Sequence, residues 1–452
     1  MPTLLLTIAA DADDAQEDQD DTDFSAVGVT LSTDSNTSQG SRRIAGLRFD
    51  NLNIPPGSTI NTAVLSVLCT DTATDDPNMD IFAEDVDDAA NFTTTADLVG
   101  RTKTTASVQY TATAVGAVRV SPADLSTVVQ EVVDRAGWAN GNALMLLLQG
   151  KSDSNTQFAF EAQPGAGADE ATLTIGFTPP DTIPYFTVLN GSGAGQSDAT
   201  DNVDLTTGTI TVDADKTLFA AVLVASDGSN NPETPANLVT DGAGDAYNWT
   251  LSEGPIICEA GGAARNAVFL YTGNSNSIRT RFGGATGTVT LDMSGAAAGP
   301  NRGRILTIIQ TENGNGVDAY VQSIGDSSDS TTTTYEIGAV TPLNAFADAT
   351  NNVTLVLLGQ RAVLGTFVED AANGWIEVVT TQLDDAADQT LTIAYKIGGD
   401  TSPNAGTYTS ALAVAGIAVE VAAVASGVAG ALAGGSGALL TFALAGGNGL
   451  AG

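Results

Sequence analysis

The sequence contains no histidine, and only 16 of its 452 residues are lysine or arginine. Without histidine the chain lacks the commonest general base, the commonest metal ligand and every catalytic triad built on an imidazole. Its 53 acidic residues bring the net charge to −37. The negative electrostatic field of this charge repels a phosphate backbone, so we expect no nucleic acid among the partners. It also keeps a protein dispersed in salty water, which fits a marine or saline source.

Cysteine is nearly absent as well. Cys69 and Cys258 lie far apart in the chain, each in an apolar run, and we expect buried free thiols rather than a disulfide. No phosphate-binding loop, nucleophile elbow or zinc spacing is present. These absences predict a protein that is not an enzyme and needs no cofactor. Glycoside hydrolysis stays open as an alternative, because it requires only two suitably placed carboxylates.

Charged residues make up 15% of the chain and hydrophobic residues 42%, and much of the remainder is Gly, Thr, Ser and Asn. This mixture favours short strands joined by tight turns over helices with charged faces. The length suits about three domains of ~150 residues. We therefore predict an all-β protein of tandem antiparallel β-sandwich domains, of the jelly-roll or immunoglobulin-like type.

Residues 1–178 form the first predicted domain. Eight apolar runs separated by turn residues are typical of strands. Their bounds are Thr3–Ala9, Ile44–Phe49, Ala63–Cys69, Met79–Phe82, Ser107–Thr111, Ala143–Gln149, Gln157–Phe160 and Ala171–Phe177. In the last run Leu173, Ile175 and Phe177 alternate with polar or small residues, which indicates a half-buried strand.

One short helix is predicted in this domain. Ser121 is the expected N-cap, with Pro122 at the first helical position and Gly137 after the end. A single apolar stripe follows helical spacing at Leu125, Val128, Val129, Val132 and Val133. We expect this helix to plug an open end of the sandwich core.

Four segments of the first domain carry a family resemblance. They are LRFDNLNIPPGSTI at residues 47–60, RTKTTASV at 101–108, VQEVVDR at 129–135 and GWANGNAL at 137–144. In this order they resemble DNRLRE-type jelly-roll modules, over about the first 180 residues. The resemblance implies a β-sandwich of a kind found on bacterial surface proteins and in phage structural proteins. It implies a fold and a setting, and no activity.

A proline-rich linker at residues 179–184 precedes an imperfect duplication over 185–312 and 313–424. Each copy runs from an apolar strand to a strand led by Trp249 or Trp375, then to one bearing Tyr271 or Tyr395, a Thr-rich strand and a last apolar strand. The pattern resembles jelly-roll or immunoglobulin-like modules of phage tail and head-surface proteins. Two separate sandwiches and two halves of one larger sandwich both fit it. The tryptophans, Trp138 included, are predicted in the core rather than on a sugar-binding surface.

Two acidic clusters are the candidate metal sites. Calcium takes six to eight oxygen ligands, which carboxylates supply. The candidate ligands are Asp11, Asp13, Asp20, Asp21, Glu84, Asp85 and Asp87. No EF-hand spacing is present, and a solvated, mobile loop is the favoured interpretation of the first cluster.

The C-terminal residues 425–452 form a Gly/Ala/Leu-rich tail. After Glu420 the remaining 32 residues (452 − 420) carry no charge. Dense glycine and the lack of flanking lysine or arginine argue against a membrane span. We predict an assembly segment whose larger apolar side chains are buried against other chains. These are Leu432, Leu439, Leu440, Phe442 and Leu444.

Together these features favour a phage structural protein on the particle exterior, either a capsid decoration or head fibre or a tail fibre or spike. The N-terminus, MPTLLLTIAADADD, has no basic region typical of a secretion signal, which fits synthesis in the host cytoplasm and a final place on the virion surface. The expected partners are other virion proteins, further copies of the chain in a homo-oligomer, and host-surface glycans. The alternatives are an extracellular bacterial adhesin or carbohydrate-binding protein, and a polysaccharide-degrading enzyme.

Deletion of residues 425–452 should lower the oligomeric state or the incorporation into particles while the sandwich domains stay folded. The tail's apolar surface is of a kind that soluble monomers seldom leave open. Ordering it costs about 1–2 kcal/mol per residue, which one short tail cannot recover alone. Size-exclusion chromatography with light scattering measures the outcome. Unchanged assembly of the truncated protein would show that the tail is a passive extension.

Overall fold

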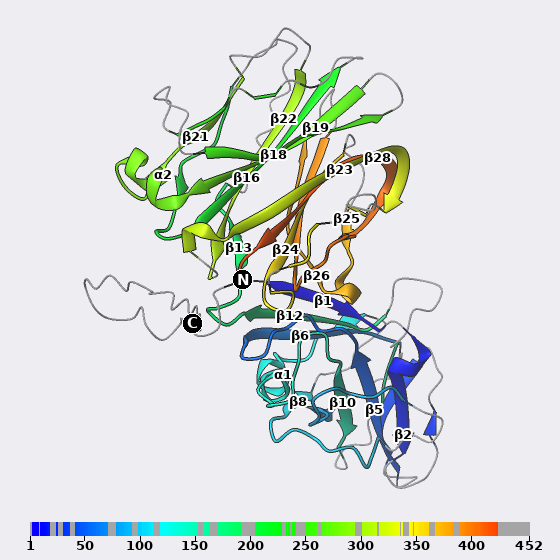
Figure 1. The fold of residues 1–452 in the computed structure, drawn as a ribbon. Helices are drawn as coiled ribbons and strands as arrows, with labels where there is room; N and C mark the ends of the chain where they lie inside the picture. Colours follow the sequence, from blue (N-terminus) through cyan, green and yellow to red (C-terminus); the bar gives the residue numbers. More distant parts are fainter. Residues whose placement is uncertain are drawn as a thin grey trace, which may run out of the picture.

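The computed structural model describes residues 2–423 except 9, 19–23, 26–29, 37–40, 71–77, 93–97, 112–117, 152–156, 162–169, 191–203, 228–231, 233, 236, 241–248, 261–263, 294–300, 314–315, 335, 338–342, 347, 361–366 and 384–388. Within this part the chain forms 28 strands and two α-helices (Figure 1). The strands assemble into several antiparallel sheets, so the predicted all-β class with tandem sandwiches is confirmed.

Strands β1 to β12 form one 12-stranded sheet that folds over at the pairing of β4 with β5 into a two-layered β-sandwich, the lower body in Figure 1. One layer contains β1 (Thr3–Thr7), β12 (Thr172–Thr178), β6 (Thr59–Cys69), β11 (Gln157–Glu161) and β4 (Thr30–Asn36). The other contains β2 (Asp14–Asp18), β5 (Ser41–Phe49), β10 (Leu144–Gly150), β7 (Asn78–Ala83) and β8 (Val108–Thr111). Two short strands, β3 (Phe24–Ser25) and β9 (Arg119–Val120), pair with β2 and β6. Leu65 and Leu173 of the first layer and Leu47 and Leu146 of the second share one buried core.

Helix α1 spans Ser126–Val133 and packs against β6 and β7, where it closes the opening between the two layers (Figure 1). The predicted stripe is buried throughout, with Val128 and Val129 at 0% exposure. The predicted start at Ser121 is wrong. Val120 still pairs with Val67 in the sheet, so the chain stays extended there and turns helical only after Leu125.

The two halves of the predicted duplication each have a sheet whose five main strands follow one order, and the second sheet has β25 as a sixth strand. The first runs β13 (Tyr185–Val188), β22 (Asn301–Glu312), β16 (Thr217–Asp227), β19 (Ala264–Asn274) and β18 (Trp249–Ala260). The second runs β23 (Tyr320–Thr334), β28 (Gly406–Val421), β24 (Val353–Gln360), β27 (Gln389–Ile397) and β26 (Trp375–Leu383), and β25 (Phe367–Glu369) adds to β28. Both sheets have the same order: the first strand of the half, its last strand, the apolar strand, the Tyr-bearing strand and the Trp-led strand. A duplicated unit would have this arrangement.

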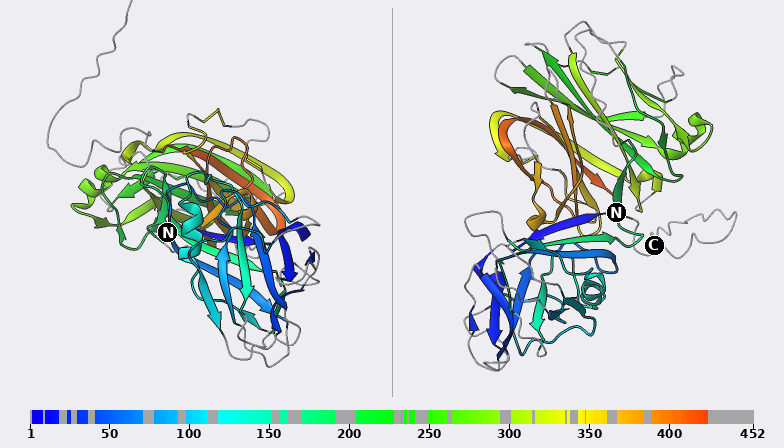
Figure 2. Two further views of the ribbon diagram at one scale, coloured as in Figure 1. Left: turned by 90° about the horizontal axis from the view of Figure 1, so that it is seen from below. Right: turned by 180° about the vertical axis from the view of Figure 1, so that it is seen from behind.

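The two five-stranded sheets pack face to face in the upper body (Figures 1 and 2). Leu223 and Leu270 of the first sheet share one core with Leu357, Ile393 and Ile417 of the second, and each of these side chains is at most 1% exposed. The edge strands β18 and β23 close one side of this core, where Ser323 Oγ donates a 3.1 Å hydrogen bond to Glu253 Oε2. The two halves thus form one larger sandwich, one of the two arrangements that the sequence left open.

The first sheet also has a covered outer face. A smaller sheet of β14 (Leu205–Thr206), β21 (Val289–Asp292) and β17 (Asn237–Thr240) lies over it, with the pair β15 (Ile210–Thr211) and β20 (Thr286–Gly287) and helix α2 (Ser275–Phe282). Helix α2 is a second helix that the sequence analysis did not predict. The Asn274 side chain caps its start by accepting from Asn276 N and Ser277 N, and Gly283 ends it at φ 68°.

The first domain contacts the larger sandwich through its linker and its turns. Asn313 Nδ2 donates to the carbonyl of Pro180 at 3.2 Å, which ties the linker to the junction between the two sheets. Asn53 Nδ2 donates to the carbonyl of Gly374. Phe186, just after the linker, is 7% exposed and packs edge-on against Tyr395, with ring centroids 5.3 Å apart. The linker is therefore tied to the larger sandwich, and the first domain also contacts that sandwich directly through Asn53.

The substitution Val129→Asp should lower the free energy of unfolding of the first domain by about 3–5 kcal/mol, because it buries a charge with no partner. Thr127→Asp is the matched control, since Thr127 is exposed in the first turn of the same helix, where an acid is favourable. Hydrogen exchange measured by mass spectrometry should show lost protection over residues 1–178 in Val129→Asp alone. Wild-type protection in that variant would contradict the buried helix.

Candidate functional site

The first acidic cluster is built into the sheet rather than left in solvent. Asp14–Asp18 form strand β2, which pairs with β5, so the expected solvated loop is wrong for these residues. Asp13, 5% exposed, accepts a 2.7 Å bond from Arg48, which also donates to Asp50 and to the carbonyl of Ala89. Arg48 is itself 7% exposed, so one buried cation pairs with the carboxylates of Asp13 and Asp50 at this corner of the domain.

The second acidic cluster pairs with two arginines. Glu84 accepts a 2.6 Å bond from Arg101, and the two side chains are each 10% exposed. Arg135, just after helix α1, binds Asp85 and also Asp87, the latter at 2.7 Å. The pKa of Arg135 is raised by these bonds, first to Asp87 and then to Asp85. These carboxylates thus hold the loop after β7 against the end of the helix.

The structure does not bring the calcium candidates together as one ligand set. In the described part of the chain, no group of three or more His, Cys, Asp or Glu side chains is placed to hold a metal ion. Asp13, Glu84, Asp85 and Asp87 each face an arginine, so structural ion pairs account for their positions. The side chain of Asp11, and Asp20 and Asp21 as whole residues, lie outside the described residues. Calcium binding there stays a prediction.

The segments that carry the family resemblance interlock around helix α1. Gln130 accepts from the Ile60 backbone NH at 2.6 Å and donates to the Ser58 carbonyl at 3.0 Å. Glu131 accepts from the backbone NH groups of Thr105 and Ala106, both at 2.7 Å. Desolvation raises the pKa of Glu131, but the bonds from Ala106 and Thr105 outweigh it and hold the pKa below its usual value.

The tryptophans are in the core, as predicted. Trp138 is 3% exposed and donates through Nε1 to the Ile54 carbonyl at 2.9 Å, which joins two of the resembling segments. Trp249 and Trp375 are 7% and 1% exposed. Cys69 and Cys258 are buried and form no disulfide, as expected.

The assembly candidates, Leu432, Leu439, Leu440, Phe442 and Leu444, lie outside the described residues, so their role stays a prediction. Within residues 2–423 with the gaps given above, no helix is long and apolar enough to cross a membrane.

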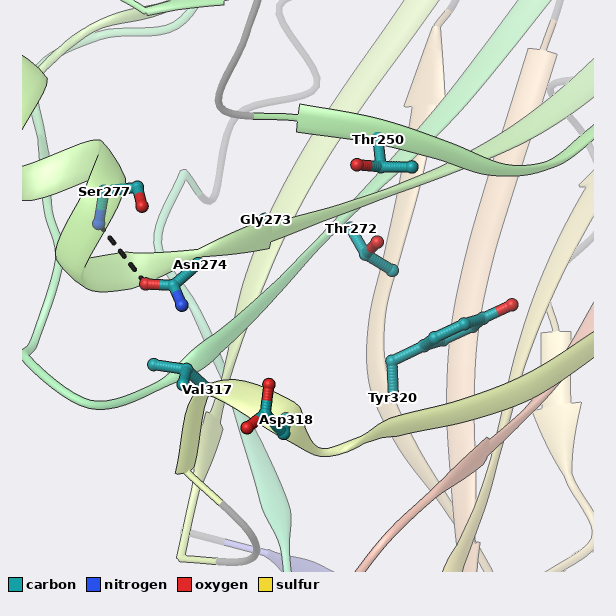
Figure 3. A pocket seen from close by; sticks show the side chains of 8 residues that line it. All are labelled: Thr250, Thr272, Gly273, Asn274, Ser277, Val317, Asp318 and Tyr320. Atoms are coloured by element: carbon teal, nitrogen blue, oxygen red, sulfur yellow. Dashed lines mark hydrogen bonds between the residues drawn. The ribbon is translucent and has the colours of Figure 1, made fainter.

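A polar pocket of about 380 Å³ lies where the two five-stranded sheets meet at their closed edge (Figure 3). It is lined by Thr250 of β18, Thr272, Gly273 and Asn274 of β19, Ser277 of α2, and Val317, Asp318 and Tyr320 at the start of the second half. Sequence reasoning missed this site. Its residues belong to segments up to 70 positions apart (320 − 250), and no local motif joins them.

The pocket wall is rigidly held. Thr217, 2% exposed at the start of β16, donates to the Gly316 carbonyl at 2.8 Å and accepts from the Ala319 NH at 2.9 Å. These two bonds fix the 3-10 turn η2 (Gly316–Asp318) that carries Asp318. The Tyr320 hydroxyl lies 3.0 Å from Ser323 Oγ. Tyr320 follows Asp318 along the same segment, below Thr250 and Thr272 in the view of Figure 3. The pocket therefore exists before any ligand binds.

A second cavity of about 340 Å³ lies between the other edge of the large sandwich and the start of the first domain. Pro2 and Thr3 cover it, and Phe186, Ile376 and Tyr395 are among its walls. Burial raises the pKa of Tyr395 well above its usual value. Burial also raises the pKa of Glu377, the carboxylate in this lining. Among the described residues that line the two cavities, each cavity has one carboxylate, Asp318 in the first and Glu377 in the second, whereas glycoside hydrolysis uses two.

No protein-family model matches the chain, and no curated protein matches it. Among solved structures, the chain is similar to the infectious bursal disease virus VP2 subviral particle, with 11% identity, 95% of this chain and 82% of that chain covered, and a TM-score of 0.17. The structure of the infectious bursal disease virus Gt strain gives 10% identity, 95% and 80% coverage, and a TM-score of 0.14. Scores this low carry no argument for this chain. The DNRLRE-type resemblance also stays a prediction.

The stability of the first domain should fall as the pH drops below about 4.5, the ordinary glutamate pKa. The folded-state pKa of Glu131 is depressed, so its contribution is present above the unfolded-state pKa and is lost as the pH falls through the folded-state value. Glu131→Gln should remove part of this dependence, and Glu161→Gln on β11 is the control. Urea unfolding from pH 6 to pH 3 measures it. Parallel pH profiles for wild type and Glu131→Gln would contradict a contribution of the Glu131 hydrogen bonds to stability.

Proposed function

We propose that this chain is a structural protein on the exterior of a virus particle, most specifically a bacteriophage decoration protein, head fibre or tail fibre. It acts by assembly with itself and with other virion proteins and contributes to host-surface attachment. One observation carries the proposal: two five-stranded sheets of one order pack into a single sandwich, with a third layer and a further domain attached. This is a rigid body of stacked sheets, and its two described cavities each contain a single carboxylate.

The charge of the chain supports an exposed position. A net charge of −37 keeps such a body soluble and apart from nucleic acid, which suits the outside of a particle rather than its packaged interior. Catalysis is not part of this proposal, since the chain has no histidine and Asp13, Glu84 and Asp87 are engaged in ion pairs with arginines.

The second candidate is an extracellular bacterial adhesin or carbohydrate-binding protein. The polar pocket beside Tyr320 favours it, because a preformed site lined by hydroxyl groups suits a glycan ligand. The two candidates differ in location, on a virion or on a cell envelope.

Particles purified from the source culture should contain the protein and should be labelled on their surface by immunogold with an antibody against it. Mass spectrometry of the same particles gives its copy number. Antibody absorbed beforehand with the purified protein is the control. A protein absent from particles and present in the cell envelope fraction would overturn the virion proposal and support the adhesin.

A further inference from the structure

We propose that the start of the C-terminal segment, residues 424–430, docks into the polar pocket between β18, β19 and the start of β23 of its own chain. Three observations support this inference. The pocket has an equivalent in the other half, an extended segment of this chain already covers that equivalent, and the last described strand ends beside the pocket. The inference concerns contacts within one chain, so it does not depend on the virion role proposed above.

The polar pocket and the second cavity lie at corresponding places in the two halves. Phe186 of β13 pairs with Thr311 of β22, and Tyr320 of β23 pairs with Val421 of β28. Thr311 is bonded to the first residue of β16, and Val421 pairs with the first residue of β24. Phe186 and Tyr320 therefore correspond. Phe186 lines the second cavity and Tyr320 lines the polar pocket.

The opposite walls of the two cavities correspond as well. In the second cavity this wall is the pair Ile376 and Tyr395, and in the polar pocket it is the pair Thr250 and Thr272 (Figure 3). Tyr395 pairs in turn with the third residue of β24, and Thr272 with the third residue of β16. Each cavity thus lies between the first strand of one half and the Trp-led and Tyr-bearing strands of the other.

An extended segment of the chain covers the second cavity. Pro2 and Thr3 lie over it, and the Pro2 carbonyl accepts a 3.1 Å bond from the Phe177 NH of β12, which holds this segment in place. None of the described residues that line the polar pocket comes from the first domain. The duplicated fold therefore provides two equivalent places for an extended segment, and the first domain occupies one of them.

The polar pocket has apolar neighbours that its covered equivalent lacks. Leu251, next to the pocket residue of β18, is 41% exposed, and Val321, next to the pocket residue of β23, is 43% exposed. The corresponding residues of the other half are Glu377 and Thr187, which are polar. Exposed Leu and Val beside a pocket suit an occupant that is itself uncharged and partly apolar.

The described chain ends beside this pocket. The Ala422 NH donates to the Ala319 carbonyl of the β23 side at 2.7 Å, and the Ala423 NH donates to Asn352 Oδ1 at 3.0 Å. Glu420, 1% exposed, accepts a 2.6 Å bond from Nδ2 of the same Asn352 side chain, so the end of β28 is fixed from two sides. The segment that follows starts about one strand spacing, ~5 Å, from the strand that forms this wall of the pocket.

The sequence of the segment fits the pocket. Residues 424–430 read VASGVAG, with no charge and no side chain larger than valine. Such a segment enters a pocket of about 380 Å³, and its valines cover the apolar neighbours. Because the chain already holds it close, docking loses little of the translational freedom that a separate partner would lose. The larger apolar residues from Leu432 onward remain for the contacts with other chains predicted above.

Two truncated proteins test the pocket side. The chain that ends at Ala423 should show about tenfold faster hydrogen exchange at residues 249–254 and 317–321 than the full-length protein. The chain that ends at Gly430 is the matched control and should exchange like the full-length protein, because it keeps the docked residues. Residues 376–378 beside the second cavity should not change in either. Equal exchange at 249–254 and 317–321 in both truncated chains would overturn the proposal.

A pocket-filling variant tests the segment itself in the full-length protein. Residues 424–430 should exchange at least tenfold more slowly than an unstructured peptide in the wild type, and Thr250→Trp should abolish this protection by filling the pocket. Val368→Trp is the control, since Val368 is 54% exposed on the edge strand β25. Exchange at the unstructured rate in the wild type, or full protection in Thr250→Trp, would refute docking. Protection lost on tenfold dilution would show that a second copy supplies the segment and would overturn docking within one chain.

Discussion

The larger body of this protein depends on strands that have no solvent-exposed face. Strand β16 directs Leu218 and Val222 toward the small outer sheet and Phe219 and Leu223 toward the facing sheet, and all four are at most 1% exposed. Every residue of β24 is buried as well. At about 1.5–3 kcal/mol per fully buried large side chain, these two strands supply much of the stability. The surface is then free to be polar and strongly acidic.

The first domain is stabilised differently, because a helix fills the opening between the two layers of its sandwich. Helix α1 buries its valines there, but its polar side chains determine how the surrounding loops lie. Gln130 holds the start of β6, Glu131 holds the loop before β8, and Arg135 holds the loop after β7. Hydrogen bonds and ion pairs within the fold therefore account for the positions of Gln130, Glu131 and Arg135.

Alternation and apolar runs predicted eight of the twelve described strands of the first domain to within a few residues, because one buried face imposes period two. They did not predict β2, β3, β4 or β9. Strand β2 escaped prediction since Asp14–Asp18 have little strand propensity and form a strand only by pairing with β5. Helix α2 escaped because its apolar stripe is short, with Ile278 buried and Phe282 packed beside the core. The pocket could not be predicted at all, since only the packing of two sheets brings Thr250 near Tyr320.

The two similar sheets must pack against each other in one alignment, and close approaches at three glycines determine it. A Cβ at Gly359 would lie 2.4 Å from Val268, one at Gly325 would lie 2.0 Å from Ile256, and one at Gly303 would lie 2.1 Å from Gln389. Each glycine leaves a hollow that a side chain of the opposing sheet fills, so sliding the sheets would bring side chains against backbone. In the sequence alone, a glycine within a strand indicates low strand propensity. In the folded protein they select one alignment of two sheets that would otherwise pack in several ways.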